Sequence, residues 1–401
     1  MKNRQLALFF CTMNLMKALV LSGGGARGAY QVGVIQAIAE IAKENHLKNP
    51  FEFFCGVSAG SINSAYMAST CDRFFEGAES LVQLWGGLTS EQVFRTDVLS
   101  LGRIGFKWIE ELSLGAIAGS TPGRSLLDTS PLYQLLSSNL NYSKIQENLS
   151  NQHFKGLAIT ALDYRTSETI TFVQGDPELS SWEKPRKRSE RAFIQPEHIM
   201  ASSAIPILFP PTPVGNRHFG DGCIRNMSPL SPAIHLGADQ LLVVGVRRET
   251  EIFPVPQNLT NPPPPSVAKV TNVLLNSVLL DGIEVDLDRL SRINEFLRRV
   301  PAEHQSNLNF KPLQSLFISP SGDIGKMASQ LGSRLPRVIR YLLKGLGPLE
   351  DASEIISYLL FEKEFMNQLI DLGFGDGMAK KKEITRFLLE SRPQSLDWEG
   401  F

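Results

Sequence analysis

The chain has 401 residues, of which 42% are hydrophobic and 20% charged, and its formal net charge is -1. This length allows a large core, and the near-neutral charge argues against nucleic-acid binding and against a general attraction to anionic surfaces. The four cysteines show no metal-binding or disulfide spacing, so neither a zinc site nor a disulfide framework is indicated, and a reducing compartment is expected. No apolar run approaches the ~20 residues that a membrane-spanning helix needs.

The first strand is predicted to begin at Lys17, which leaves residues 1–15 as an N-terminal extension. Met1, Met13 and Met16 are all candidate start residues. The apolar beginning resembles a signal peptide, but it is short and no small-residue cleavage site follows it. We therefore expect a cytoplasmic protein, and secretion as an effector stays open.

A glycine-rich turn follows this strand, and a helix from Ala29 to about Glu44 follows the turn. The turn consists of Gly23, Gly24, Gly25, Ala26, Arg27 and Gly28. Such a turn presents free backbone N–H groups to an anion. Its glycines also fit Gly-x-Gly-x-x-Gly, but the acidic residue that a dinucleotide site needs at the end of the second strand is absent, and the Gly-Lys-Ser/Thr of a phosphate loop is missing. An oxyanion hole is the favoured interpretation.

Two roles are open for Arg27. Its side chain either fixes the glycine turn or faces the phosphate of a lipid, and the sequence favours the structural role.

The second strand, near Phe51 to Cys55, runs directly into Gly56-Val-Ser-Ala-Gly60, and a helix of small and apolar residues follows. Strand, sharp turn and helix predict a nucleophile elbow that exposes the hydroxyl of Ser58. Gly56 and Gly60 are expected because side chains there would clash with the strand or the helix. A Gly-x-Ser-x-Gly match alone is also compatible with an ordinary turn.

The middle of the chain is predicted to be mainly helical between residues 72 and 150. Within it, residues 102–123 are expected to form either a wall or lid of a lipophilic cleft or ordinary helical packing. Two paired strands are expected at residues 156–161 and 168–173, followed by a polar loop over residues 175–195. This loop holds Trp182 and five basic residues, and a peripheral membrane contact is one hypothesis for it, beside a solvated loop.

A further strand is predicted to end at Asp221 and Gly222, after a helix near residues 198–205. This turn can bring a carboxylate to Ser58. Buried strands are expected again at residues 240–246 and 315–319, with a stiff proline spacer and amphipathic helices between them. From residue 324 to 390 the pattern is helical, and its apolar stripe indicates core packing.

Four stretches together resemble the patatin-like phospholipase family. They are the glycine turn, Gly56-Val-Ser-Ala-Gly60, Ala201-Ser-Ser-Ala-Ile-Pro206 with the following Pro210-Pro211, and Asp221-Gly222. The resemblance implies an α/β three-layer sandwich with a central, mostly parallel sheet, and hydrolysis of acyl-ester lipids such as phospholipids without metal or cofactor. Matched by position, Ser58 would be the nucleophile, Asp221 the base, and residues 23–28 the oxyanion hole. Cys223 departs from the family's usual Asp-Gly-Gly or Asp-Gly-Ala, and would be strained if this position needs a positive φ.

We expect residues 16–320 to form the catalytic domain and residues 321–401 a helical region packed on it. A rival mechanism is a Ser-Asp-His triad, for which His235 and His304 follow the acid in the chain order that an α/β-hydrolase requires. His218 is close to Asp221 in sequence but is predicted to face away. Two different classes of protein also stay open, a catalytically silent lipid-binding or scaffold protein and a nucleotide-binding enzyme. The oligomeric state, the head group and the acyl length are not indicated.

Overall fold

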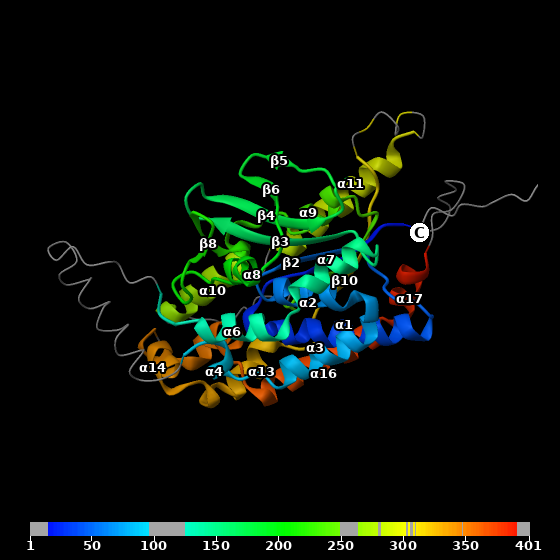
Figure 1. Cartoon of the computed structure of the whole chain (residues 1–401). Helices are drawn as coiled ribbons and strands as arrows, with labels where there is room; N and C mark the ends of the chain where they lie inside the picture. Colours follow the sequence, from blue (N-terminus) through cyan, green and yellow to red (C-terminus); the bar gives the residue numbers. More distant parts are fainter. Residues whose placement is uncertain are drawn as a thin grey trace, which may run out of the picture.

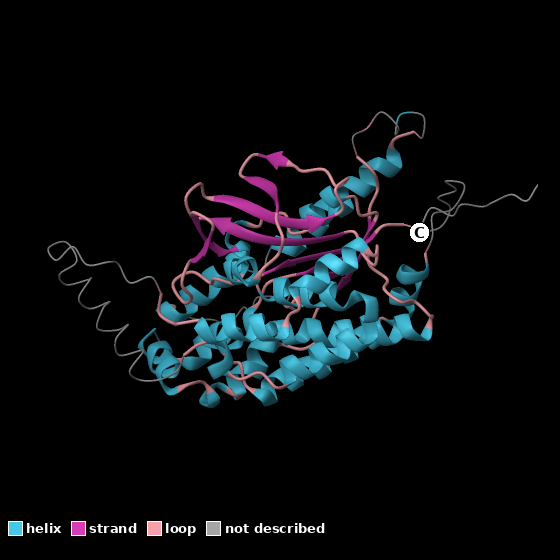
Figure 2. Ribbon diagram, viewed as in Figure 1, coloured by secondary structure: helices cyan, strands magenta, loops and turns pink. Residues whose placement is uncertain are grey.

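The computed structural model describes residues 15–95, 125–248 and 264–390, except 280, 281, 302, 303, 305–307, 309 and 347. Its centre is a ten-stranded, mostly parallel sheet (Figures 1 and 2). In sheet order the main path runs β10 (Gln314–Ile318), β9 (Gln240–Val244), β1 (Lys17–Leu21), β2 (Phe53–Val57), β3 (Gly156–Asp163), β4 (Glu168–Gly175), β6 (Lys187–Arg191) and β5 (Glu183–Lys184). The first five of these strands are parallel, and β4 pairs antiparallel with β3.

Two short strands leave this path and carry the predicted acid. β8 (Arg217–Asp221) pairs antiparallel with the end of β3, and β7 (Thr212–Val214) pairs with β8. The register sets Ala161 of β3 opposite Asp221, which is the last residue of β8.

Both faces of the sheet are covered by helices, which makes the predicted three-layer architecture. Successive residues of the buried strands alternate between two cores: Leu19 and Leu21 belong to one, and Ala18 and Val20 to the other. This alternation follows from the two-residue period of a strand. Apart from Lys17 and Gln240 at their first positions, β1, β2 and β9 have apolar sequences, which reflects burial on both faces, as is typical of parallel sheets.

The larger layer contains the helices of the N-terminal half and those of the C-terminus. Its long helix α1 (Gly28–Glu44) packs along α16 (Lys363–Ala379), as Figure 1 shows. The other members from the N-terminal half are α2 (Ala59–Thr70), α3 (Phe74–Gly86), α4 (Ser90–Val93), α6 (Ser130–Asn139), α7 (Tyr142–Ser150) and α8 (Pro196–Ser202). Those from the C-terminus are α13 (Ile324–Gln330), α14 (Arg337–Leu346), α15 (Ser353–Leu359) and α17 (Lys381–Leu389).

The second layer is smaller. It contains α9 (Ser231–Leu236) and α11 (Gly282–Arg299), whose residues Leu236, Ile283 and Leu290 join the second core. α10 (Val267–Leu279) precedes α11, so the predicted amphipathic stretch is a pair of helices. The predicted apolar stripe of the C-terminus, including Ile356, Phe365 and Leu369, is core, as expected.

One predicted element is wrong. The stretch 175–195 is not a loop throughout, because β5 and β6 form there and β6 pairs with β4 at the sheet edge. Its polar sequence hid these strands, since an edge strand is only half-buried and needs no apolar alternation. The predicted wall or lid at residues 102–123, and most of the proline spacer, lie outside the described residues.

Candidate active site

Ser58 occupies the elbow between β2 and α2. Its φ of 53° and ψ of -127° are strained for a residue with a side chain. The two flanking glycines are required by close backbone contacts: a Cβ on Gly56 would lie 2.2 Å from the carbonyl oxygen of Gly60, and a Cβ on Gly60 would lie 2.3 Å from that of Leu21. Strand, sharp turn and helix follow one another here as the sequence predicted, and the role of Ser58 as nucleophile stays a prediction.

Asp221 lies within hydrogen-bonding distance of the elbow serine. The Oγ of Ser58 donates to Oδ2 of Asp221 at 2.6 Å, and the backbone N–H of Cys223 donates to Oδ1 at 2.8 Å. Both side chains are buried, with 3% and 1% of their surfaces exposed. The chain separation is 163 residues, so it is the pairing of β8 with β3 that brings the two groups together.

Burial raises the pKa of Asp221 to about 6, against the lowering effect of hydrogen bonds from Ser58 and Cys223. Removal from water disfavours the charged carboxylate. A carboxyl group with this pKa is ionised at neutral pH and is a stronger base than a free aspartate, so it can accept the proton of a serine hydroxyl during an attack.

Ser202, at the end of α8, positions the elbow and has no distinguishing signal in the sequence. Its Oγ accepts the backbone N–H of Ser58 at 2.9 Å and donates to the carbonyl oxygen of Thr160 at 2.6 Å. Two residues later, the carbonyl oxygen of Ala204 accepts the N–H of Asp221 at 2.9 Å. The stretch Ala201-Ser-Ser-Ala-Ile-Pro206 is part of the family resemblance, but its contacts with Ser58 and Asp221 depend on the tertiary structure.

The glycine turn lies beside the serine, because β1 and β2 are parallel neighbours. A Cβ built on Gly23 would be 2.9 Å from Cβ of Ser58 and 3.6 Å from its Oγ. A short 3₁₀ helix, η1 (Gly25–Arg27), then leads into α1. The N–H groups of Arg27 and Gly28 donate within the turn, whereas the turn as a whole lies close to where negative charge would develop in an attack by Ser58.

Gly25 is the position in this turn where a side chain is least tolerable. Its φ is +55°, and a Cβ would lie 2.4 Å from the backbone oxygen of Tyr358. For the oxyanion hole predicted from the sequence, Gly25→Ala should lower the turnover of a soluble ester at least about 100-fold, because the turn must shift and such donors act only at short range. Turnover is measured, and the circular dichroism spectrum is recorded to check that the variant folds. The matched control for the loss of a left-handed glycine is Gly215→Ala, at an open position with a φ of +59°. Equal activity of the Gly25 variant and the control would contradict the prediction.

Cys223 is not strained, contrary to the concern raised by the departure from the family pattern. It is not among the residues with a positive φ, and it lies in a 3₁₀ turn, η3 (Gly222–Arg225), capped by Asp221. Its Sγ occupies the space beside Gly23, where a Cβ would lie 2.3 Å from the sulfur. Burial and the neighbouring Asp221 raise the pKa of the thiol well above its usual value, so the group stays protonated.

Arg27 does not face solvent. Its side chain is 2% exposed and forms an ion pair with Glu354, which favours the structural role over contact with a lipid phosphate.

The candidate histidines of a triad are engaged or exposed elsewhere. Nδ1 of His235 lies 2.7 Å from the carbonyl oxygen of Ser231, and its ring stacks on Trp182 at a centroid distance of 4.9 Å. His218 and His304 are exposed. The acceptor for the Ser58 hydroxyl is the carboxylate of Asp221.

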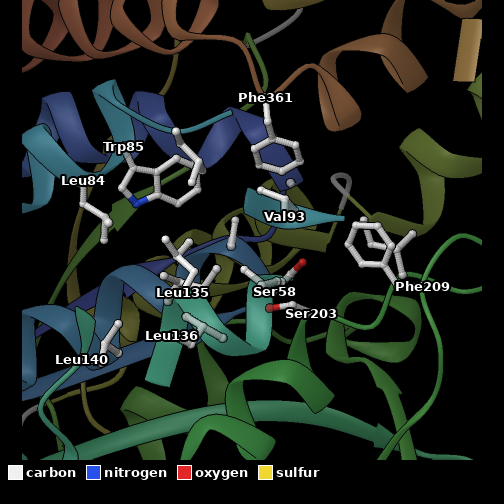
Figure 3. A pocket seen from close by; sticks show the side chains of 16 residues that line it. Ser58, Leu84, Trp85, Val93, Leu135, Leu136, Leu140, Ser203, Phe209 and Phe361 are labelled. Carbon is white, nitrogen blue, oxygen red and sulfur yellow. The ribbon is translucent and has the colours of Figure 1, made fainter. Parts of the chain in front are cut away.

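An apolar pocket opens on the serine (Figure 3). Ser58 and Ser203 lie at one side of the pocket, while Leu84 and Leu140 lie away from them. The remaining walls are almost entirely carbon, with side chains that include Ile62, Trp85, Leu88, Val93, Leu132, Leu135, Leu136, Ile205, Phe209 and Phe361. Such a lining is suited to a hydrocarbon chain, and not to a charged group.

The polar stretch 175–195 exposes fewer unpaired basic and aromatic side chains for a membrane contact than its sequence indicates. Trp182 is only 8% exposed, because it packs in the second core. Arg188 pairs with Glu168 and Glu190 at 3.2 Å each. The membrane contact thus stays a hypothesis for the exposed Lys184, Arg186 and Arg191, the last of which also donates to carbonyl oxygens such as that of Asp176.

Two kinds of feature are absent from the described residues. They contain no group of three or more histidine, cysteine or acidic side chains arranged to hold a metal ion. No described helix is long and apolar enough to cross a membrane.

The chain matches a family model. Residues 19–234 match the model described as patatin-like phospholipase, which is more than half of the chain. The chain therefore belongs to the patatin-like phospholipase family, as its motifs predicted. Family membership supports lipid acyl hydrolase activity. No curated protein matches this chain.

Solved structures with a similar arrangement include human GIVD cytosolic phospholipase A2, VipD from Legionella pneumophila and the type III effector protein ExoU. The sequence identities are 12%, 13% and 15%, and the TM-scores are 0.43, 0.30 and 0.33. The matches cover 93%, 89% and 94% of this chain but 59%, 67% and 54% of those chains, respectively. With identities and TM-scores this low, the family model is the finding that assigns the chain.

Proposed function

We propose that this protein hydrolyses the acyl esters of lipids, as a phospholipase A or lysophospholipase, with Ser58 and Asp221 as a catalytic dyad. The observation that carries the proposal is the 2.6 Å hydrogen bond from the Ser58 hydroxyl to Asp221 at the mouth of an apolar pocket. The family supplies the lipid class, and the dyad supplies a nucleophile and a base without a cofactor.

The reaction begins when Asp221 accepts the hydroxyl proton while Oγ of Ser58 attacks the ester carbonyl carbon. The carbonyl oxygen becomes an oxyanion, which N–H groups of the glycine turn other than those of Arg27 and Gly28 stabilise, since these two already donate within the turn. The ester C–O bond then breaks, and the leaving alcohol takes the proton from Asp221. This leaves an acyl group on Ser58 and an ionised Asp221, the same protonation state as in the free enzyme.

A second half-reaction restores the enzyme. Asp221 takes a proton from water while the water oxygen attacks the acyl carbon. The bond to Oγ of Ser58 breaks, the serine recovers its proton from Asp221, and the fatty acid leaves. Because one carboxyl group carries the proton in both halves, a pKa near neutrality suits both the base and the acid steps.

The apolar pocket is proposed to hold the acyl chain, with its carbonyl at Ser58 and its methyl end toward Leu84 and Leu140 (Figure 3). Burial of each methylene group is worth about 0.8 kcal/mol. The enzyme should therefore favour long chains over short ones, up to the length that the pocket accommodates.

We expect Leu84→Trp to shift the substrate preference toward shorter acyl chains. The larger side chain fills the end of the pocket away from Ser58, so kcat/KM for a long-chain ester should fall by about tenfold or more, while that for a butyryl ester should stay within about threefold. Leu389→Trp, at a residue that is 52% exposed in α17, is the control for the added indole. Equal losses on both esters would show that the pocket does not receive the chain.

A direct test separates hydrolysis from lipid binding without turnover. Purified protein is incubated with phospholipid and lysophospholipid vesicles, and released fatty acid is measured by mass spectrometry. We expect release by the wild type and none above background by Ser58→Ala. Vesicle binding without release by either protein would favour a catalytically silent lipid-binding protein.

A further inference from the structure

A C-terminal helix lies against the glycine turn, although it falls outside residues 19–234, which match the family model. The helix is α15, and it contacts η1 directly. The backbone oxygen of its Tyr358 occupies the space that a side chain on Gly25 would need. Phe361, two residues after the helix, lines the apolar pocket (Figure 3).

Arg27 connects the two segments. Its Nε donates to Oγ of Ser357 at 2.7 Å, and its Nη2 is paired with the carboxylate of Glu354. The guanidinium also lies 5.0 Å from the ring centroid of Tyr358, and Nη1 donates to the carbonyl oxygen of Val246 at 3.3 Å. Three of these four partners belong to α15. A guanidinium this deeply buried needs such compensation, because an unpaired charge in the interior is costly.

The backbone of Arg27 is part of the turn that it anchors. Arg27 is the last residue of η1, and its own N–H donates to the carbonyl oxygen of Gly24 at 3.1 Å. Three consecutive glycines precede this point, and glycine is the residue with the greatest backbone freedom. An oxyanion hole requires its donors at a fixed distance from the reacting oxygen. Something outside the turn must therefore hold it, and α15 packs against η1 more extensively than α2 or α16 does.

We propose that Glu354 and Ser357 are positioning residues for the oxyanion hole, which act through Arg27. The C-terminal helical region is then part of the hydrolytic machinery and not only a cover for the core. This inference rests on the function proposed above. It predicts a loss in the chemical step, because the residues touch neither the substrate nor the pocket.

The main variant is Glu354→Gln, which keeps the shape and an acceptor oxygen but removes the charge. We expect kcat for a soluble short-chain ester to fall by about 10- to 100-fold, with KM within about twofold, and labelling of Ser58 by a fluorophosphonate to slow by a similar factor. Deleting one oxyanion donor lowers the rate by roughly 10²–10³-fold. Moving a donor without deleting it should lower kcat by less, which gives the expected range.

The matched control is Glu364→Gln in the same C-terminal region. Glu364 also pairs with an arginine, Arg334, but both side chains are exposed, at 43% and 51%. We expect wild-type kcat and labelling from this control. Thermal unfolding is recorded for every variant, so that a change in turnover is compared among folded proteins.

A second variant guards against misfolding caused by a lone buried charge. Arg27→Met with Glu354→Met removes both members of the pair, and such replacements are often tolerated. We expect this double variant to fold and to show about the same loss of kcat as Glu354→Gln, since both release the turn. Wild-type kcat and labelling in either folded variant would overturn the inference.

The same experiment separates this inference from the proposed function. If the wild type turns over the ester, Ser58→Ala does not, and Glu354→Gln equals the wild type, then only the positioning role is wrong. If the wild type shows neither turnover nor labelling that depends on Ser58, the proposed hydrolysis is wrong and the positioning role with it.

Discussion

Ser58→Ala should abolish ester hydrolysis and labelling by a fluorophosphonate. The serine oxygen forms the covalent bond in the proposed mechanism, and alanine offers no atom that can replace it. Loss of a serine nucleophile typically lowers kcat by about 10⁶-fold, so only background hydrolysis should remain. Turnover of a chromogenic short-chain ester and gel-based detection of the probe are the two measurements.

The fold of this variant is expected to be preserved. The hydroxyl makes one hydrogen bond, to Asp221, whereas the elbow itself is held by the backbone N–H of Ser58, which donates to Ser202. Ser69→Ala removes another buried serine hydroxyl, which donates to the carbonyl oxygen of Tyr66 within α2 and does not line the pocket, and is the matched control, which should still be labelled. Probe attachment to the Ser58 variant would mean that another residue is the nucleophile.

The elements that carry the site were predictable, because their sequences have strong local signals. An apolar run followed by Gly56-Val-Ser-Ala-Gly60 and then by small residues admits few structures other than strand, tight turn and helix. The same holds for the glycine turn between β1 and α1. Parallel pairing of β1 and β2 then sets both turns at one edge of the sheet.

Contacts between distant segments were not predictable in the same way. Asp221 contacts Ser58 only because the short strand β8 pairs antiparallel with β3. The sequence of β8 does not indicate whether it pairs parallel or antiparallel, or with which strand. The contacts of Ser202 and Glu354 depend on where α8 and α15 end up in the larger layer. A serine at a helix end and a glutamate in a first helical turn are too common to be selected in advance.

The polar stretch 175–195 shows how composition can mislead. Five basic residues and a tryptophan predicted an exposed loop, yet pairing with β4 places Trp182 against His235 in the second core. Neighbouring carboxylates compensate Arg188, so its charge contributes less to the outer surface than its sequence context indicated. Such ion pairs depend on the register between strands, so the local sequence of residues 175–195 does not show which charges are compensated.

Asp221→Asn should lose activity nearly as fully as Ser58→Ala, by about 10⁴-fold or more, because the dyad acts as one unit. An amide cannot accept the proton of the serine hydroxyl. His218→Ala, His235→Ala and His304→Ala should retain substantial activity in the same assay. A folded but inactive histidine variant would favour a triad instead.

The pH dependence gives a second measure of Asp221. Its pKa is raised to about 6, and the ionised form is the base, so kcat/KM of the wild type should be constant above pH 7 and fall tenfold per pH unit well below pH 6. This fall alone would also fit a histidine base. Persistence of the same profile in all three histidine variants assigns it to Asp221, whereas its disappearance in one of them would assign it to that histidine.

The raised pKa of Asp221 also predicts how stability depends on pH. As pH rises, activity should increase, whereas the contribution of this carboxyl group to stability should decrease. Between the usual aspartate pKa of 3.8 and about 6, the folded state binds more protons at this carboxyl than the unfolded state, so this group's contribution to stability declines as pH rises through that window. Above about pH 6, the ionised buried carboxylate lowers the free energy of unfolding by up to about 3 kcal/mol. Asn carries no charge, and its oxygen can still accept the N–H that Cys223 donates. Asp221→Asn should therefore be at least as stable as the wild type at pH 8 and lose that advantage near pH 4, as measured by urea unfolding. A variant that is much less stable than the wild type at pH 8 would show that the carboxylate holds the site together, and that its loss of activity cannot be assigned to the missing base.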